Sequence, residues 1–236
     1  MNVLIACEES QSVCKAFRKL GHNAFSCDIL PSSGGHPEWH FKNDVFEIIK
    51  NKGGVLESGD KLKIKGNWDL MIAHPPCTYL AVSGARWFYH PEDKNLPIEK
   101  RRPHPRFPDR AKHRDEALEF FIKLYESPIE KIAIENPVGI ISSKYRKPDQ
   151  TVHPWMFGDE ASKATCLWLK NLPLLEPTNI VGKGERVVLS SGRTLPKWYS
   201  DSFHTSIPTE LRRTLRSKTF QGFADAIAEQ WSKKLN

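Results

Sequence analysis

The chain has 236 residues, of which 39% are hydrophobic and 27% are charged, and its net charge is +7. This composition excludes a disordered chain, and the length fits one α/β domain with a substantial core. The positive charge permits a polyanionic partner without requiring one.

Five cysteines without regular spacing argue against a disulfide framework and favour a reducing compartment. The apolar start, residues 3–7, is too short for a signal peptide or a membrane span, because Glu8 and Glu9 follow it at once. We therefore expect a cytoplasmic protein without membrane contact.

The first part of the chain predicts a strand, a helix and a second strand. Residues 3–7 and 24–28 are the strands, and residues 10–12 offer an N-cap for the helix between them. This order, with Asp28 ending the second strand, is typical of sites where a carboxylate binds the ribose of a nucleotide-like cofactor. No G-x-G-x-x-G turn accompanies it. The apolar face of the helix is expected from Val13, Phe17 and Leu20.

The next stretch combines loops with one short helix. Residues 31–40 hold two histidines, but no metal-binding partner motif accompanies them, so we expect loop packing. Asp44 is expected either to cap the short helix that follows or to lie over the adenine edge of a cofactor. Residues 50–66 predict an exposed connection or a small hairpin.

Residues 68–77 are the stretch around which the chain is organised. Residues 70–73 predict a buried strand, and it stops at Pro75 and Pro76 because prolines cannot donate to a sheet. Cys77 is thereby delivered to a loop at the carboxyl end of the strand, where open α/β sheets place their chemistry.

A second apolar run, residues 131–134, ends at Glu135-Asn136-Pro137 and leaves a carboxylate at another strand end. A cysteine and a glutamate on neighbouring strand ends suggest nucleophilic attack with acid assistance. The alternative is a buried Cys77 and a solvated Glu135 without a joint role.

Residues 78–114 lie between these strands and combine basic with aromatic side chains, and their prolines exclude a continuous helix. This composition suits contact with a phosphate backbone and an unstacked base; the alternative is a solvated, mobile loop. Residues 110–125 predict an amphipathic helix, residues 163–169 a strand, and residues 222–235 a final helix. We expect one domain, 1–236, with a basic lid at about 78–114 and a small irregular region at about 176–216.

Together these motifs resemble the DNA (cytosine-5) methyltransferase family. Pro75-Pro76-Cys77 resembles its catalytic Pro-Cys motif, and Glu135-Asn136-Pro137 resembles its Glu-Asn-Val motif. Lys163-Ala164-Thr165 is similar to its basic strand motif and residues 220–228 to its closing helix motif. The likeness is greatest to short, phage-borne members without a large recognition domain; if the protein is phage-encoded, we expect it in the host cytoplasm.

The resemblance implies an α/β, Rossmann-like S-adenosylmethionine-dependent methyltransferase fold with a mostly parallel sheet and helices on both faces. It implies methylation of cytosine carbon 5 in DNA. The oligomeric state does not follow from the sequence, and a monomer is slightly favoured. Cys77 would add at carbon 6, Glu135 would hydrogen-bond or protonate ring nitrogen 3, and Asn136 would orient Glu135 or contact the loop. The residues expected at the cofactor are Cys7, Glu8, Glu9, Asp28, Ile29, Asp44, Val45, His74 and Pro75. Those expected at the nucleic acid are Ser83, Arg86, Arg101, Arg102, Lys163 and Thr165.

Two features depart from the family pattern. Glu8 and Glu9 stand near the family's glycine turn, where a carboxylate would repel the cofactor's own carboxylate unless it meets the ammonium group. Residues 168–218 are short for a target-recognition domain. Two alternatives therefore remain: a catalytically inactive DNA-binding or anti-restriction relic, and an enzyme acting on a free pyrimidine nucleotide. An amino methyltransferase is disfavoured, because His74 stands where that chemistry needs Asp or Asn before the two prolines.

Overall fold

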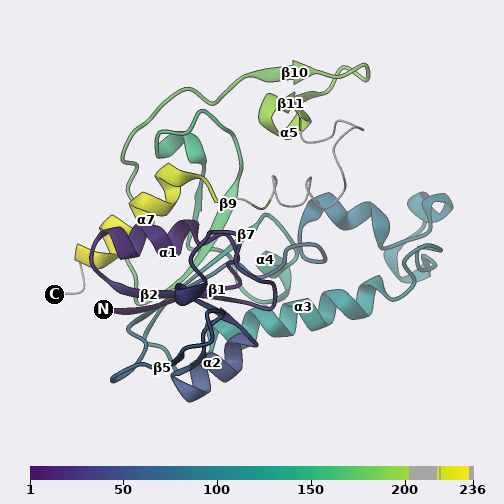
Figure 1. Cartoon of the computed structure of the whole chain (residues 1–236). Helices are drawn as coiled ribbons and strands as arrows, with labels where there is room; N and C mark the ends of the chain where they lie inside the picture. The colour runs from purple at the N-terminus through teal and green to yellow at the C-terminus, as the bar shows by residue number, and fades with distance from the viewer. Residues whose placement is uncertain (202–216, 218, 234–236) are drawn as a thin grey trace.

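The computed structural model describes residues 1–201, 217 and 219–233, and a seven-stranded sheet runs through this part of the chain (Figure 1). Its strand order is β3-β2-β1-β6-β7-β9-β8. The strands are β1 (Asn2–Ala6), β2 (Asn23–Asp28), β3 (His40–Lys42), β6 (Leu70–Ala73), β7 (Lys131–Pro137), β8 (Gln150–Val152) and β9 (Thr165–Lys170). Two small antiparallel pairs are β4 (Gly53–Val55) with β5 (Lys61–Lys63), and β10 (Arg186–Val188) with β11 (Thr194–Pro196).

The five strands from β3 to β7 are parallel, and β9 runs antiparallel to both of its neighbours, β7 and β8. This arrangement is the Rossmann-like methyltransferase fold expected from the sequence. β6 is apolar throughout, and β1 is apolar from Val3 to Ala6, because helices cover both faces of the sheet.

The helices divide between those two faces (Figure 1). α1 (Ser12–Lys19) and α7 (Gln221–Lys233) pack together on one face, where Phe17 and Trp231 are fully buried. α2 (Val45–Asn51), α3 (Arg110–Tyr125) and α4 (Ile141–Lys144) cover the other, where Phe121 is fully buried. α5 (Lys197–Asp201) follows β11. The 3-10 turns are η1 (Pro37–Trp39), η2 (Val82–Trp87), η3 (Pro91–Asn95), η4 (Ile98–Lys100) and η5 (Pro154–Met156).

Several expected elements are confirmed. β6 and α3 have the predicted bounds, and β4 and β5 form the small hairpin within residues 50–66. Asp44 caps α2, because its Oδ1 accepts a hydrogen bond from the Phe46 amide at 2.7 Å. His40, expected in a loop, instead begins β3, where it pairs with Ser26 of β2 and lies 2.8 Å from the hydroxyl of that residue. Among the described residues, no helix is long and apolar enough to cross a membrane.

Other expectations are wrong or lie outside the described residues. Leu20 is 44% exposed at the end of α1, so it does not belong to the buried face of that helix. β7 runs to Pro137 rather than ending at residue 134, because its last residues pair with β9. Residues 202–216 of the predicted irregular region, and the end of the predicted final helix beyond residue 233, lie outside the description.

Candidate active site

The carboxyl edge of the sheet brings together the two motifs singled out in the sequence. Parallel pairing of β6 with β7 sets Ala73 opposite Ile134. The residues that follow, His74 on one strand and Glu135 on the other, therefore reach the same edge of the sheet. Glu135 is itself part of β7, where it pairs with Leu167 of β9. The backbone of Glu135 is thus held by β9, one residue beyond the last pair of β7 with β6.

His74 and Glu135 form a side-chain contact at this edge. Nδ1 of His74 lies 3.4 Å from Oε2 of Glu135, and the side chains are 12% and 18% exposed. Burial by itself would raise the pKa of Glu135, but the hydrogen bond from His74 and the positive charge of Lys163 outweigh it, so the pKa is lowered. Glu135 is therefore ionised at neutral pH. Nε2 of His74 is buried without a hydrogen-bond partner among the described residues.

The loop that carries Cys77 is fastened to the end of β7. The buried side chain of Asn136 donates from Nδ2 to the carbonyl of Pro75 at 2.9 Å, which is the loop contact expected for it. Gly139 packs so closely on this loop that an added Cβ would lie 2.1 Å from the carbonyl oxygen of Leu80. Cys77 itself is exposed. The position of Cys77 therefore depends on Asn136 and Gly139, which follow Glu135 in the chain.

A small hollow opens beside Glu135, with a volume of about 10 Å³. This is room for about one water molecule. Lys163 and Thr165, predicted at the nucleic acid, belong to its wall. The complete lining is Glu135, Val152, His153, Pro154, Lys163, Thr165, Thr219, Phe220 and Phe223. A pyrimidine ring at Glu135 therefore requires this hollow to widen.

The N-terminus of α1 is capped by Glu8, whose carboxyl group is 3% exposed. Its oxygens accept hydrogen bonds from the amides of Val13, at 2.7 Å, and Cys14, at 3.2 Å. The expected cap from residues 10–12 is wrong, since Gln11 has a φ of 58° and makes no side-chain cap. Burial raises the pKa of Glu8, and the positive charge of His74 opposes that rise. Glu8 thus occupies amides that could otherwise bind an anionic ligand.

Two carboxylates and one apolar side chain form the surface where the cofactor is expected. Asp28 accepts from the Leu30 amide through Oδ1, and Ile29, next in the chain, is 76% exposed. Burial raises the pKa of Cys7, and the negative charges of Asp28 and Asp44 add to that rise. Such a set can accept from ribose hydroxyls and offer an apolar face to adenine. A nucleoside is therefore the chemical class that such a set of side chains would suit.

The remaining residues expected at the cofactor have different settings. The side chain of Val45 packs in the core beneath α2, and Pro75 is buried behind the Cys77 loop. Glu9 is only partly buried, and burial raises its pKa, as does the negative charge of Asp28. Of the two acids in the altered first motif, one is therefore a helix cap and the other lies partly open near Asp28.

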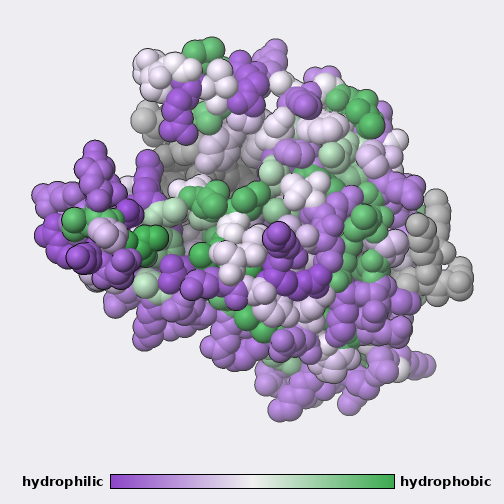
Figure 2. All heavy atoms as spheres, turned by 180° about the vertical axis from the view of Figure 1, so that it is seen from behind, coloured by the Kyte–Doolittle hydropathy of each residue, from purple (hydrophilic) through white to green (hydrophobic). Residues whose placement is uncertain are grey.

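The residues between β6 and α3, hereafter the 78–109 segment, project beyond the end of α3 (Figure 1) and have a largely hydrophilic surface (Figure 2). Arg110 anchors this segment to α3. Its buried guanidinium donates to the carbonyl of Thr78 at 2.7 Å and lies 5.1 and 5.0 Å from the ring centres of Tyr79 and Phe88. The contact has no sequence signal beyond an arginine at the start of a helix.

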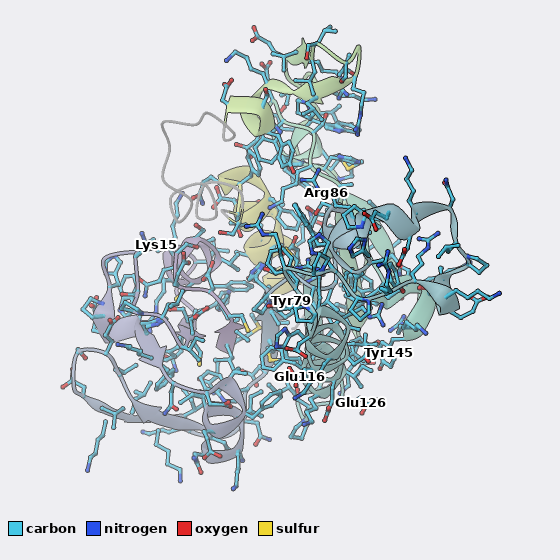
Figure 3. All side chains as sticks on the ribbon, turned by 90° about the vertical axis from the view of Figure 1, so that its right-hand side faces the viewer. Lys15, Tyr79, Arg86, Glu116, Glu126 and Tyr145 are labelled. Atoms are coloured by element: carbon cyan, nitrogen blue, oxygen red, sulfur yellow. The ribbon has the colours of Figure 1, made fainter. Side chains whose placement is uncertain are left out.

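The predicted nucleic-acid contacts in this segment differ in their availability. Arg102 is bound within the segment by Asp93, at 2.7 Å, and by Glu92, at 3.0 Å; its guanidinium lowers the pKa of Asp93 to about 2. Arg101 donates to two backbone carbonyls. Arg86 and its neighbour Ser83 are exposed in η2, and Figure 3 shows Arg86 in the same part of the molecule as Tyr79.

No protein-family model matches the sequence, and no curated protein matches it. The solved structures that are similar to the chain in part include the following three. A protein described as a DNA modification methyltransferase encoded within a prophage (E. coli) is 15% identical, with a TM-score of 0.42, over 77% of this chain and 52% of that chain. A DNMT2 mutant from Spodoptera frugiperda is 13% identical, with a TM-score of 0.39, over 89% and 61%. The Dnmt2 methyltransferase of S. pombe is 13% identical, with a TM-score of 0.36, over 100% and 66%.

The chain therefore spans about half of the first of these proteins and less than two thirds of the second. Likenesses at this level carry no conclusion about activity. The assignment of the fold rests on the order and direction of the strands, and the function has to be argued from the site.

Proposed function

We propose that this protein methylates carbon 5 of cytosine in DNA, using S-adenosylmethionine, through a covalent bond between Cys77 and carbon 6. The observation that carries the proposal is the junction of the two motifs. The loop that leads to Cys77 is bonded through the Pro75 carbonyl to Asn136, the residue next to Glu135. A nucleophile in the loop after β6 and a carboxylate on the adjoining strand β7 suit addition to a ring with charge stabilisation on its other side.

The sulfur of Cys77, as thiolate, adds to carbon 6 and makes carbon 5 nucleophilic as an enamine. Glu135 takes up a proton from solvent as the base covers it, hydrogen-bonds the ring edge, and passes this proton to nitrogen 3 as charge develops there. The bound cofactor supplies the methyl group for carbon 5. The carbon-5 proton is then lost to a water molecule, which expels Cys77 as thiolate, and nitrogen 3 returns its proton to Glu135, which restores the neutral ring. Glu135 is ionised before the base arrives; a base that excludes water from it favours the protonated form needed for this step.

The cofactor would be held by Asp28 at the ribose, Ile29 against the adenine and Asp44 at the adenine edge. Glu9 is available to the ammonium group of the methionine part. Repulsion of the cofactor's carboxylate is expected from Glu9 rather than from Glu8, because Glu8 is committed to the amides of α1.

The DNA would present its cytosine outside the helix, since carbon 6 cannot be attacked within the stack, at a cost of about a few kcal/mol. Lys163 and Thr165 border the hollow that must widen for the base. Arg86, Arg101 and Ser83 of the 78–109 segment would contact the backbone, with this segment closing over the site.

The test is a trapping experiment with duplex DNA in which 5-fluorocytosine replaces cytosine. The fluorine blocks loss of the carbon-5 substituent, so wild-type protein with S-adenosylmethionine should give an adduct that survives denaturation. The same duplex with ordinary cytosine should give no lasting adduct. An adduct in Cys77→Ala as strong as in wild type would overturn the assignment of Cys77, and no adduct in wild type would overturn the mechanism.

The narrowness of the hollow beside Glu135 favours, as a second candidate, a non-catalytic DNA-binding protein of the same fold. S-adenosylhomocysteine separates the two, since a ligand that binds the native state raises its melting temperature by mass action. No rise at saturating ligand supports the non-catalytic protein. Protection by a free cytidine nucleotide instead of DNA would support a nucleotide-modifying enzyme.

A further inference from the structure

The 78–109 segment contains a cavity of its own, of about 380 Å³. This volume is within the range of small-molecule sites, about 300–1,000 Å³. None of its lining residues borders the hollow at Glu135. The lining consists of Ala85, Arg86, Trp87, Tyr89, His90, Pro91, Lys94, Arg101 and His104.

The wall of this cavity is cationic. Three side chains that carry positive charge, those of Arg86, Lys94 and Arg101, line it together with two histidines, and no carboxylate does. The acids nearest in the chain, Glu92 and Asp93, are bound to Arg102, and Glu92 also lies 3.5 Å from Nδ1 of His90 in the wall. The cavity therefore favours a ligand that carries negative charge.

The same wall is aromatic. The guanidinium of Arg86 lies 4.7 Å from the ring centre of Trp87, and that of Arg101 lies 5.6 Å from the ring centre of Tyr89. Surfaces that pair aromatic rings with arginine are those on which unstacked nucleic-acid bases stack. A nucleotide matches both features, because its phosphate is negatively charged and its base can stack on the rings.

The cavity is also built in advance of a ligand. Arg101 is fixed by the carbonyls of Leu96, at 2.7 Å, and Lys94, at 2.9 Å. Trp87 packs against the ring of His104 with the ring centres 5.2 Å apart. Side chains that are already ordered lose little conformational freedom on binding, which favours affinity.

We propose that this cavity binds one unstacked nucleotide of a DNA strand, at a place apart from the cytosine site at Glu135. The phosphate would meet Lys94 and Arg86, and the base would stack on the Trp87 and Tyr89 wall. The choice of DNA rests on the proposed function, whereas the nucleotide chemistry follows from the cavity itself. The 78–109 segment would then bind DNA at a nucleotide other than the target cytosine.

The test measures binding of a fluorescent single strand made only of thymine, so that no cytosine chemistry is involved. Lys94→Glu reverses an exposed charge in the cavity wall and should weaken binding by about tenfold, because a cation that meets a phosphate is replaced by an anion. Lys100→Glu is the matched control, since Lys100 is exposed on the same segment outside the lining and should change binding less than about twofold. Equal losses in both variants, or none in Lys94→Glu, overturn the proposal.

Two further arms identify the ligand. An abasic strand of the same length should bind wild type more than about fivefold more weakly, because stacking is worth about 1–3 kcal/mol per base. Equal affinity for the abasic strand overturns the base site. Thymidine monophosphate should compete with the strand only at far higher concentration; competition at the strand's own concentration overturns DNA as the source in favour of a free nucleotide. Loss of 5-fluorocytosine trapping with this binding intact would be a failure of the proposed function alone.

Discussion

Nδ1 of His74 lies 3.4 Å from Oε2 of Glu135, which joins the side chains of two motifs 61 residues apart in the sequence. An ionised carboxylate can only accept a hydrogen bond, so the proton in this contact is carried by Nδ1. His74, expected at the cofactor, is therefore in a place to orient Glu135 and to set its charge.

Replacing His74 by leucine should raise the pKa of Glu135, because it removes a hydrogen bond and a positive charge and leaves the effect of burial. Titration of ¹³C-labelled glutamate carboxyl groups by NMR measures the shift. The control is His36→Leu, which breaks a second histidine–glutamate contact, with Glu38 at 2.9 Å, and should move the signal of Glu38 alone. An unchanged Glu135 titration in His74→Leu would contradict the contact.

The lowered pKa of Glu135 should appear in the stability of the protein. Because the folded state favours the ionised form, this carboxylate contributes stability above the ordinary glutamate pKa of 4.5, and the contribution is lost as the pH falls through the lowered value. Chemical unfolding at a series of pH values should show wild type losing stability relative to Glu135→Gln in that acid range. Parallel curves for the two proteins would disprove it.

Glu8 should behave in the opposite way, because burial raises its pKa. The folded state then favours the protonated form, so the associated stability is present below the ordinary pKa and is lost as the pH rises. The difference in unfolding free energy between Glu8→Gln and wild type should therefore shift in favour of Glu8→Gln as the pH rises from 4.5 toward neutrality.

Glu8→Ala, which removes the cap of α1, should lower the unfolding free energy by about 0.5–2 kcal/mol. Equal stability of wild type and Glu8→Ala would refute the cap.

Arg110→Ala should release the 78–109 segment from α3, since it removes the bond to Thr78 and the contacts with Tyr79 and Phe88. Brief digestion with chymotrypsin, followed by mass mapping, should show faster cleavage within this segment. The control is Lys112→Ala, at an exposed position on the same helix, which should be cut at the wild-type rate. If both variants resist digestion as wild type does, Arg110 is not the anchor.

Gly139→Ala should move the Cys77 loop, because the new methyl group would lie 2.1 Å from the Leu80 carbonyl and backbone must shift to admit it. We expect slower 5-fluorocytosine trapping and a loss of about 1–3 kcal/mol of stability. Gly182→Ala is the control, since the nearest atom to its added Cβ is a side-chain oxygen at 3.7 Å. Trapping at the wild-type rate in Gly139→Ala would show that the position of Cys77 does not depend on the packing of Gly139.

The local pattern of apolar and polar residues was enough to predict many of the strands and helices. The apolar run of β6 and the amphipathic pattern of α3 predicted their bounds to the residue, and Asp44 was recognised as a possible cap. Each of these depends on residues close together in the chain. The bounds of β7 were missed because its last residues are held by β9, which follows it by about 30 residues.

The sequence by itself determined which chemistry stands at the ends of which strands: a thiol after two prolines, a glutamate and asparagine at the end of β7, and an acid at the end of β2. Only the tertiary structure decided how these side chains are used. Glu8 turned out to cap a helix, His74 to contact Glu135, and Arg102 to be bound within its own segment. The reason is that strand order and register bring distant residues to one edge, whereas local pattern reports only which face of an element is buried.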